Sequence, residues 1–91
     1  MKDEGKWDLL GYIFSSKHRL KVLRIFEKDV MMPNEIAKKT CIRINHVSNI
    51  LKQLMENGFI RCENPSAKKG RLYTITDKGR QILEMIKMMD K

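Results

Sequence analysis

The chain has 91 residues and carries 19 Lys and Arg against 11 Asp and Glu, a formal net charge of +8. This length allows one domain with a thin core, and its 42% hydrophobic content with only two prolines excludes a disordered chain. The positive charge favours a polyanionic partner, nucleic acid before an anionic membrane. The longest apolar run, Leu9–Phe14, is too short for a membrane span or a signal-peptide core. We therefore predict no membrane contact and a cytoplasmic location.

Cysteine and histidine are too sparse for a disulfide framework or a structural zinc site. Cys41 and Cys62 form no CxxC pair, and the histidines at 18 and 46 are not grouped with them at a ligand-like spacing. We expect no bound metal, no cofactor and reduced thiols. The chain has no Ser/His/Asp or Cys/His arrangement, no paired acids and no phosphate-binding glycine loop. It therefore has no candidate catalytic residues, no evident small-molecule ligand, and is not expected to be an enzyme.

The first predicted helix covers Leu9–Phe14 together with Trp7. Trp7, Leu10 and Phe14 share one face at helical spacing. This face either packs on its own domain or contacts a second copy of the chain, and the sequence leaves both alternatives open.

A second helix is predicted over Lys17–Lys28, where a hydroxyl of Ser15 or Ser16 can cap its first free N–H groups. Its basic side is expected to face solvent rather than DNA, and its buried stripe comprises Leu20, Val22, Leu23 and Phe26. Beyond it, Pro33 biases Met32 towards extended backbone, which predicts a short edge strand within residues 29–32.

The stretch Pro33–Ile60, PNEIAKKTCIRINHVSNILKQLMENGFI, predicts a short helix, a tight turn and a longer helix. Pro33 suits the first helical turn, the short helix ends near Thr40, and Cys41 occupies the turn. Ile42 is expected to anchor the turn in the core. The longer helix runs from about Ile44 to Asn57, and its expected core seam comprises Val47, Leu51, Leu54 and Gly58, the last as a left-handed cap.

The outward side of this longer helix is polar and almost free of acids, since its single acid, Glu56, lies at the far end. Ordinary exposed helices mix Glu with Lys, so a merely solvated face is the weaker interpretation. Asn45 and Asn49 lie one turn apart, and each amide can pair with an adenine edge for about 1–3 kcal/mol of discrimination. The predicted DNA-reading side chains are Arg43, Asn45, His46, Ser48, Asn49 and Lys52.

The segments Phe59–Glu63 and Arg71–Ile75 alternate like strands and flank a loop rich in turn residues, which predicts a β-hairpin. Residues 61–76 carry four basic groups against one acid. Lys68, Lys69 and Arg71 are therefore candidates for phosphate contacts, although a solvated loop tip is the alternative. Thr76 is predicted to cap a final helix over Asp77–Met89, whose apolar side comprises Ile82, Met85, Ile86 and Met89.

Three segments, SSKHRLKVL, the stretch 33–60 and GRLYTITDKG, in this order and spacing, resemble winged helix-turn-helix transcriptional regulators of the ArsR/MarR type, especially small archaeal ones. The resemblance covers Ser16–Ile82, about three quarters of the chain. It implies a mostly helical α+β fold with a β-hairpin wing and flanking terminal helices. It also implies a recognition helix in the major groove, a wing on the backbone or minor groove, and a homodimer.

The sequence departs from the family pattern at two points. Cys41 stands where a small residue or glycine is common, which leaves the turn geometry and any redox role open. The metal-binding cysteine pair of the metal-sensing branch is absent, which argues against metal-responsive regulation.

We therefore predict one winged-helix domain over residues 1–91 that binds double-stranded DNA as a homodimer and regulates transcription. Residues 1–14 and 77–91 are the expected dimerisation elements, through Trp7, Leu10, Phe14, Ile82, Met85, Ile86 and Met89. Two alternatives remain: a winged helix used for protein contact in a transcription or replication assembly, and a non-specific binder of double-stranded RNA or chromatin.

Overall fold

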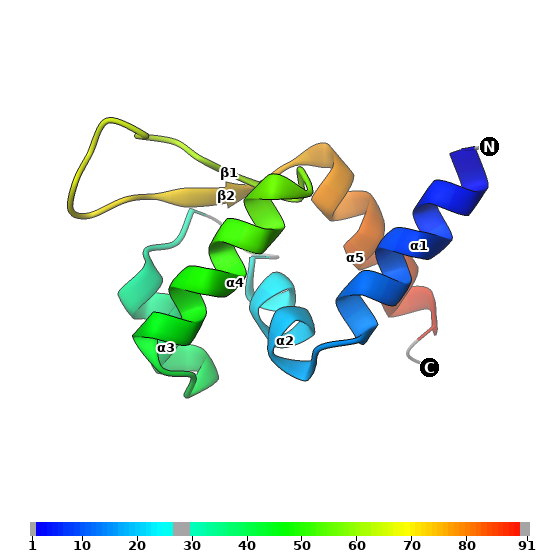
Figure 1. Cartoon of the computed structure of the whole chain (residues 1–91), viewed down its shortest axis with the longest axis horizontal. Coiled ribbons are helices and arrows are strands. Elements are labelled where there is room, and N and C mark those ends of the chain that lie inside the picture. Colours follow the sequence, from blue (N-terminus) through cyan, green and yellow to red (C-terminus); the bar gives the residue numbers. More distant parts are fainter. Residues whose placement is uncertain (1, 27–29, 90–91) are drawn as a thin grey trace.

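The computed structural model describes residues 2–26 and 30–89, with side chains from residue 8 onward. Figure 1 shows the described helices around a central core and a hairpin that extends from it. The predicted mostly helical α+β fold is confirmed. In chain order the elements are α1 (Lys2–Phe14), α2 (Lys17–Ile25), α3 (Pro33–Thr40), α4 (Ile44–Glu56), β1 (Ile60–Cys62), β2 (Tyr73–Ile75) and α5 (Asp77–Met89).

The molecule is elongated, with principal extents of 38 × 26 × 20 Å. The hairpin loop occupies one end of the long axis, and α1 and α5 contact each other at the opposite end (Figure 1). Between the two ends, α4 packs on α2 and α3. The chain's terminal helices and its wing are therefore held far apart.

Helix α2 is the centre of the core, since it contacts α1, α3, α4 and α5. Val22, Leu23 and Phe26 are fully buried, as the apolar stripe predicted. The helix ends at Ile25 with Phe26 as its C-cap, and the remainder of the predicted helix, 27–29, lies outside the described residues.

The first helix is longer than predicted, since α1 begins at Lys2 rather than near Trp7. Its buried face comprises Leu10 and Ile13, whereas Phe14 is 44% exposed. Residues 10 and 13 lie three apart on one face of the helix, which is the face directed at α2 and α5. The polar start of the chain has no apolar residues repeated at helical spacing, so the sequence does not predict that the helix begins this early.

Helix ends are capped as the sequence predicts. The Ser16 hydroxyl accepts a hydrogen bond from the Arg19 N–H at 3.1 Å, and the Thr76 hydroxyl accepts one from the Gly79 N–H at 3.1 Å. Gly58, which follows α4, has a φ of 77°, the left-handed conformation expected of it. These caps fix where α2 and α5 begin and where α4 ends.

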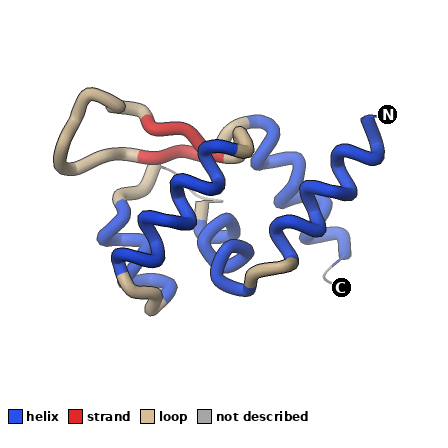
Figure 2. The backbone as a smooth tube through the Cα atoms, in the orientation of Figure 1, coloured by secondary structure: helices blue, strands red, loops and turns tan. Residues whose placement is uncertain are grey.

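The two strands form an antiparallel hairpin with Ile60 opposite Ile75 and Cys62 opposite Tyr73. Figure 2 shows that they are short and that a long loop joins them. Both strands are shorter than predicted. Beyond their paired residues the Asn64 side chain binds the opposite side of the loop: its Oδ1 accepts from the Leu72 N–H at 2.7 Å, and its Nδ2 donates to the Gly70 carbonyl at 3.1 Å.

The predicted edge strand before Pro33 is a single bridge rather than a strand. Met31 and Tyr73 exchange two backbone hydrogen bonds, with N–O distances of 2.8 and 2.9 Å. The bridge joins the segment leading into α3 to the base of the wing, so the start of the helix-turn-helix and the hairpin are positioned together.

Candidate nucleic-acid interface

One apolar face of helix α4 packs on the core. Val47, Leu51 and Leu54 are buried as predicted, Ile50 is a fourth buried residue that the predicted seam omitted, and Gly58 is exposed. Burial of this face leaves the opposite side in solvent. All six predicted reading residues are exposed: Arg43, Asn45, His46, Ser48, Asn49 and Lys52.

The turn between α3 and α4 sets the direction in which α4 leaves. The buried Thr40 hydroxyl donates to the Ile36 carbonyl at 2.6 Å, and Cys41 adopts a left-handed φ of 59°. Ile42 is 5% exposed and anchors the turn in the core, as predicted. Cys41 thus takes the backbone conformation for which glycine is the usual residue, while its thiol faces solvent.

The wing carries its cations in two different roles. Arg71 braces the loop, since its Nε donates to the Ala67 carbonyl at 2.8 Å. Arg61 pairs with Glu63 at 2.9 Å. Lys68 and Lys69 are exposed and have no hydrogen-bond or ion-pair partner within the described part of the chain. The two lysines are therefore available to bind an anion.

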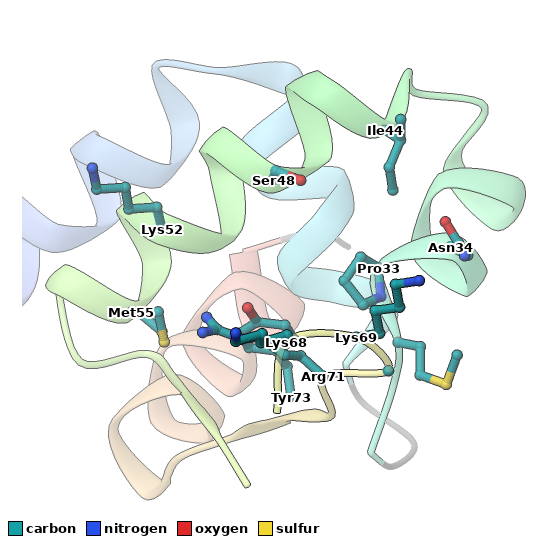
Figure 3. A pocket seen from close by; sticks show the side chains of 12 residues that line it. Pro33, Asn34, Ile44, Ser48, Lys52, Met55, Lys68, Lys69, Arg71 and Tyr73 are labelled. Carbon is teal, nitrogen blue, oxygen red and sulfur yellow. The ribbon is translucent and has the colours of Figure 1, made fainter. Parts of the chain in front are cut away.

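A groove of about 790 Å³ separates α4 from the wing. Figure 3 shows Ile44, Ser48 and Lys52 along α4 on one side and the wing side chains on the other. No acid lines it, and all its charged side chains are cations. The complete lining is Met32, Pro33, Asn34, Ile44, Ser48, Lys52, Met55, Lys68, Lys69, Gly70, Arg71 and Tyr73.

The groove brings together only part of the predicted site. Ser48 and Lys52 join the three wing cations in it, whereas the remaining four reading residues lie outside its lining. His46, one of these four, instead contacts His18 on α2, with ring centroids 4.8 Å apart. The sequence prediction missed His18, because nothing in the local pattern of α2 indicates that its first turn lies against α4.

The apolar residues predicted for dimerisation fall into two groups. Leu10, Ile82 and Ile86 are buried in the core of the single chain, so these side chains pack on their own domain. Met85 is half-buried, and Phe14 and Met89 are 44% and 57% exposed. Met88, beside Met89 on α5, is 75% exposed. The side chain of Trp7 lies outside the described residues.

Within residues 2–26 and 30–89, no helix is long and apolar enough to cross a membrane. No group of three or more His, Cys, Asp or Glu side chains there is placed to hold a metal ion.

A family model described as winged helix-turn-helix matches residues 19–91. The chain belongs to the winged helix-turn-helix family. The predicted resemblance to ArsR/MarR regulators is confirmed, because solved regulators of both types share this winged-helix fold. No curated protein sequence matches the chain.

Three solved winged-helix structures illustrate the similarity. TubR from Bacillus thuringiensis, solved bound to 24 bp of tubC, has a TM-score of 0.81 at 18% identity over 92% of this chain and 94% of TubR. The homodimeric DNA-binding domain of Mb0332 from Mycobacterium bovis has a TM-score of 0.75 at 18% identity over 94% of this chain and 80% of that one. MarR from E. coli has a TM-score of 0.69 at 25% identity over 91% of this chain and 66% of MarR.

Proposed function

We propose that this winged-helix chain is a sequence-specific regulator of transcription that binds double-stranded DNA as a homodimer. The observation that carries the proposal is the exposed side of α4, which presents asparagines and no acid in its N-terminal half and faces the wing cations across a groove. Base-reading groups and phosphate-binding groups thus lie on neighbouring surfaces, the combination that sequence-specific binding requires.

In this proposal α4 enters the major groove. Asn45 and Asn49 are exposed one turn apart, so both amides can reach adenine edges from the same side of the helix. Ile44 is 41% exposed and can contact a thymine methyl group. Arg43, His46, Ser48 and Lys52 complete the proposed reading surface.

The wing supplies the phosphate contacts or enters the minor groove. Lys68 and Lys69 project from the loop, Arg71 stands at its base, and Lys52 of α4 lines the same groove (Figure 3). Each phosphate neutralised adds about 0.9 to the slope of log K against log salt. A binding mode of this kind is therefore strongly dependent on salt.

Dimerisation is proposed through the end of the molecule formed by α1 and α5. Exposed Phe14, Met88 and Met89 and half-buried Met85 supply apolar area there. The wing lies at the other end of the 38 Å long axis, so a two-fold axis at this end leaves both wings outermost (Figure 1). The two α4 helices would then read half-sites one helical turn apart, about 34 Å, on an inverted repeat.

The deciding experiment is selection of bound sequences from a random DNA pool at physiological salt. We expect recovery of a palindromic motif. A pool without a motif, bound in a salt-dependent way, contradicts the proposal and favours the non-specific nucleic-acid binder. Weak, salt-insensitive DNA binding favours the protein-interaction module. Residence in the cytoplasm stays a prediction that follows from the proposed DNA target.

A further inference from the structure

Two imidazole rings from separate helices meet on the surface beside the proposed reading surface. His18 lies in the first turn of α2 and His46 in the first turn of α4. Their ring centroids are 4.8 Å apart with an interplanar angle of 70°, and both residues are exposed. Only the packing of α2 against α4 brings them together.

The backbones that carry these rings are held in a fixed relation. Arg19, the neighbour of His18, donates two hydrogen bonds to the Gln53 side chain on α4, at 3.2 and 3.0 Å. Its own N–H is bound by the Ser16 cap at 3.1 Å. Val22 and Val47 are both fully buried and belong to the same hydrophobic core. The two helices are therefore clamped, while the exposed rings keep their torsional freedom.

We propose that His18 and His46 form a two-imidazole site for a divalent transition-metal ion of the kind that prefers imidazole, such as Zn²⁺ or Ni²⁺. A metal–nitrogen distance near 2.0–2.1 Å places two nitrogens on one ion about 3–3.5 Å apart. The proposed site requires the two rings, whose centroids are 4.8 Å apart, to rotate until one nitrogen of each reaches this spacing. Because the described residues hold no group of three or more ligating side chains, water completes the coordination shell.

This inference departs from the expectation that the chain binds no metal. That expectation rested on the lack of a CxxC pair and of histidines grouped with the cysteines. The two histidines are also too far apart in the sequence to suggest a shared site. One consequence rests on the proposed function: His46 is also a proposed DNA-reading residue. Metal and DNA then compete for the same imidazole, and each lowers the affinity of the protein for the other.

The metal site is tested without DNA, on the tag-free full chain with NiCl2 or ZnCl2 as the probe. The background variant Cys41→Ser with Cys62→Ser removes both thiols as competing ligands. We expect one ion per chain by calorimetric titration. At ten times the dissociation constant, the metal should raise Tm by about 6–11 °C. His18→Gln and His46→Gln should each weaken metal binding at least tenfold.

The matched control is Lys21→Gln, an exposed change on the same helix that keeps both imidazoles and should bind metal like the background variant. The proposal is overturned if neither ion raises Tm, or if the rise persists in the double variant His18→Gln with His46→Gln. Thermal unfolding without metal checks that each variant is folded.

Competition between metal and DNA is tested with a DNA duplex recovered from the selection. NiCl2 should weaken its binding at least fivefold in the background variant and leave His18→Gln unaffected. Metal binding with unchanged DNA affinity would overturn the competition between the two ligands. Absence of DNA binding by the metal-free protein would overturn the proposed function, whereas the titrations without DNA decide the metal site independently.

Discussion

The Arg19 guanidinium of α2 is bound to the Gln53 side chain of α4 through two hydrogen bonds to one oxygen, at 3.2 and 3.0 Å. The same guanidinium donates to the Tyr12 carbonyl of α1 at 2.5 Å and lies 3.9 Å above the Tyr12 ring. Three helices therefore meet at one partly buried cation, and the proposed recognition helix α4 is joined through it to α1, which is proposed for dimerisation.

Arg19→Ala should lower the free energy of unfolding by about 2–3 kcal/mol, because the charge-assisted hydrogen bonds from α2 to α1 and α4 are lost. Urea denaturation measures the change. Arg19→Lys keeps the charge but loses the planar fork, so it should recover only part of the loss. The control Lys21→Ala, exposed on the same helix, should stay within about 0.5 kcal/mol of the parent. Equal losses of stability in Arg19→Ala and Lys21→Ala would contradict the role of Arg19 in holding the three helices together.

Gly79→Ala should destabilise the fold by about 1–3 kcal/mol, the range for overpacking. A Cβ at this position would lie 2.2 Å from the Phe59 carbonyl oxygen, so α5 can pass the end of α4 only without a side chain here. Urea denaturation measures the free energy of unfolding of this variant, and Gly11→Ala is the control for comparison. Gly11 lies within α1 with nothing within 4 Å of a built Cβ, so alanine there should stabilise the helix by about 0.5–1 kcal/mol.

Lys68→Ala combined with Lys69→Ala should weaken binding to every DNA sequence alike. If each lysine neutralises one phosphate, the slope of log K against log salt should fall by about 1.8, twice the contribution of a single contact. Fluorescence anisotropy over a salt series measures it. An unchanged slope would show that these lysines do not contact phosphates.

Asn49→Ala should change which bases are preferred rather than the salt dependence. Loss of one amide–adenine pair costs about 1–3 kcal/mol of discrimination at one position of the half-site. Repeating the selection from a random pool with this variant measures the preference. If Asn49→Ala behaves like the double lysine variant, the division between reading and positioning residues is wrong.

Met88→Lys with Met89→Lys should convert the proposed homodimer to a monomer. These side chains are 75% and 57% exposed in the single chain, so the charges should disrupt association without unfolding the domain. Analytical ultracentrifugation measures the mass, and circular dichroism checks the helix content. A parent chain that is monomeric at micromolar concentration would contradict dimerisation through this end.

Much of the fold could be predicted because each element carries its own local pattern. The α5 bounds, Asp77–Met89, follow from the Thr76 cap and the apolar period, and the α3 bounds follow from Pro33 and the turn at Cys41. Exposure of the six reading residues follows from the period of α4, since the residues opposite a buried seam must face solvent. Local chemistry therefore determined the element order, the exposed polar side of α4 and the basic loop.

What the sequence alone could not decide is which elements lie against each other. The contact between His18 and His46, the Arg19 clamp and the burial of Leu10, Ile82 and Ile86 all depend on helix packing between distant segments. The hydrogen bonds of the Asn64 side chain to the opposite side of the loop likewise depend on the folded hairpin. A helical period identifies a buried face but not the partner that covers it, because the same apolar stripe can pack on its own domain or on a second chain.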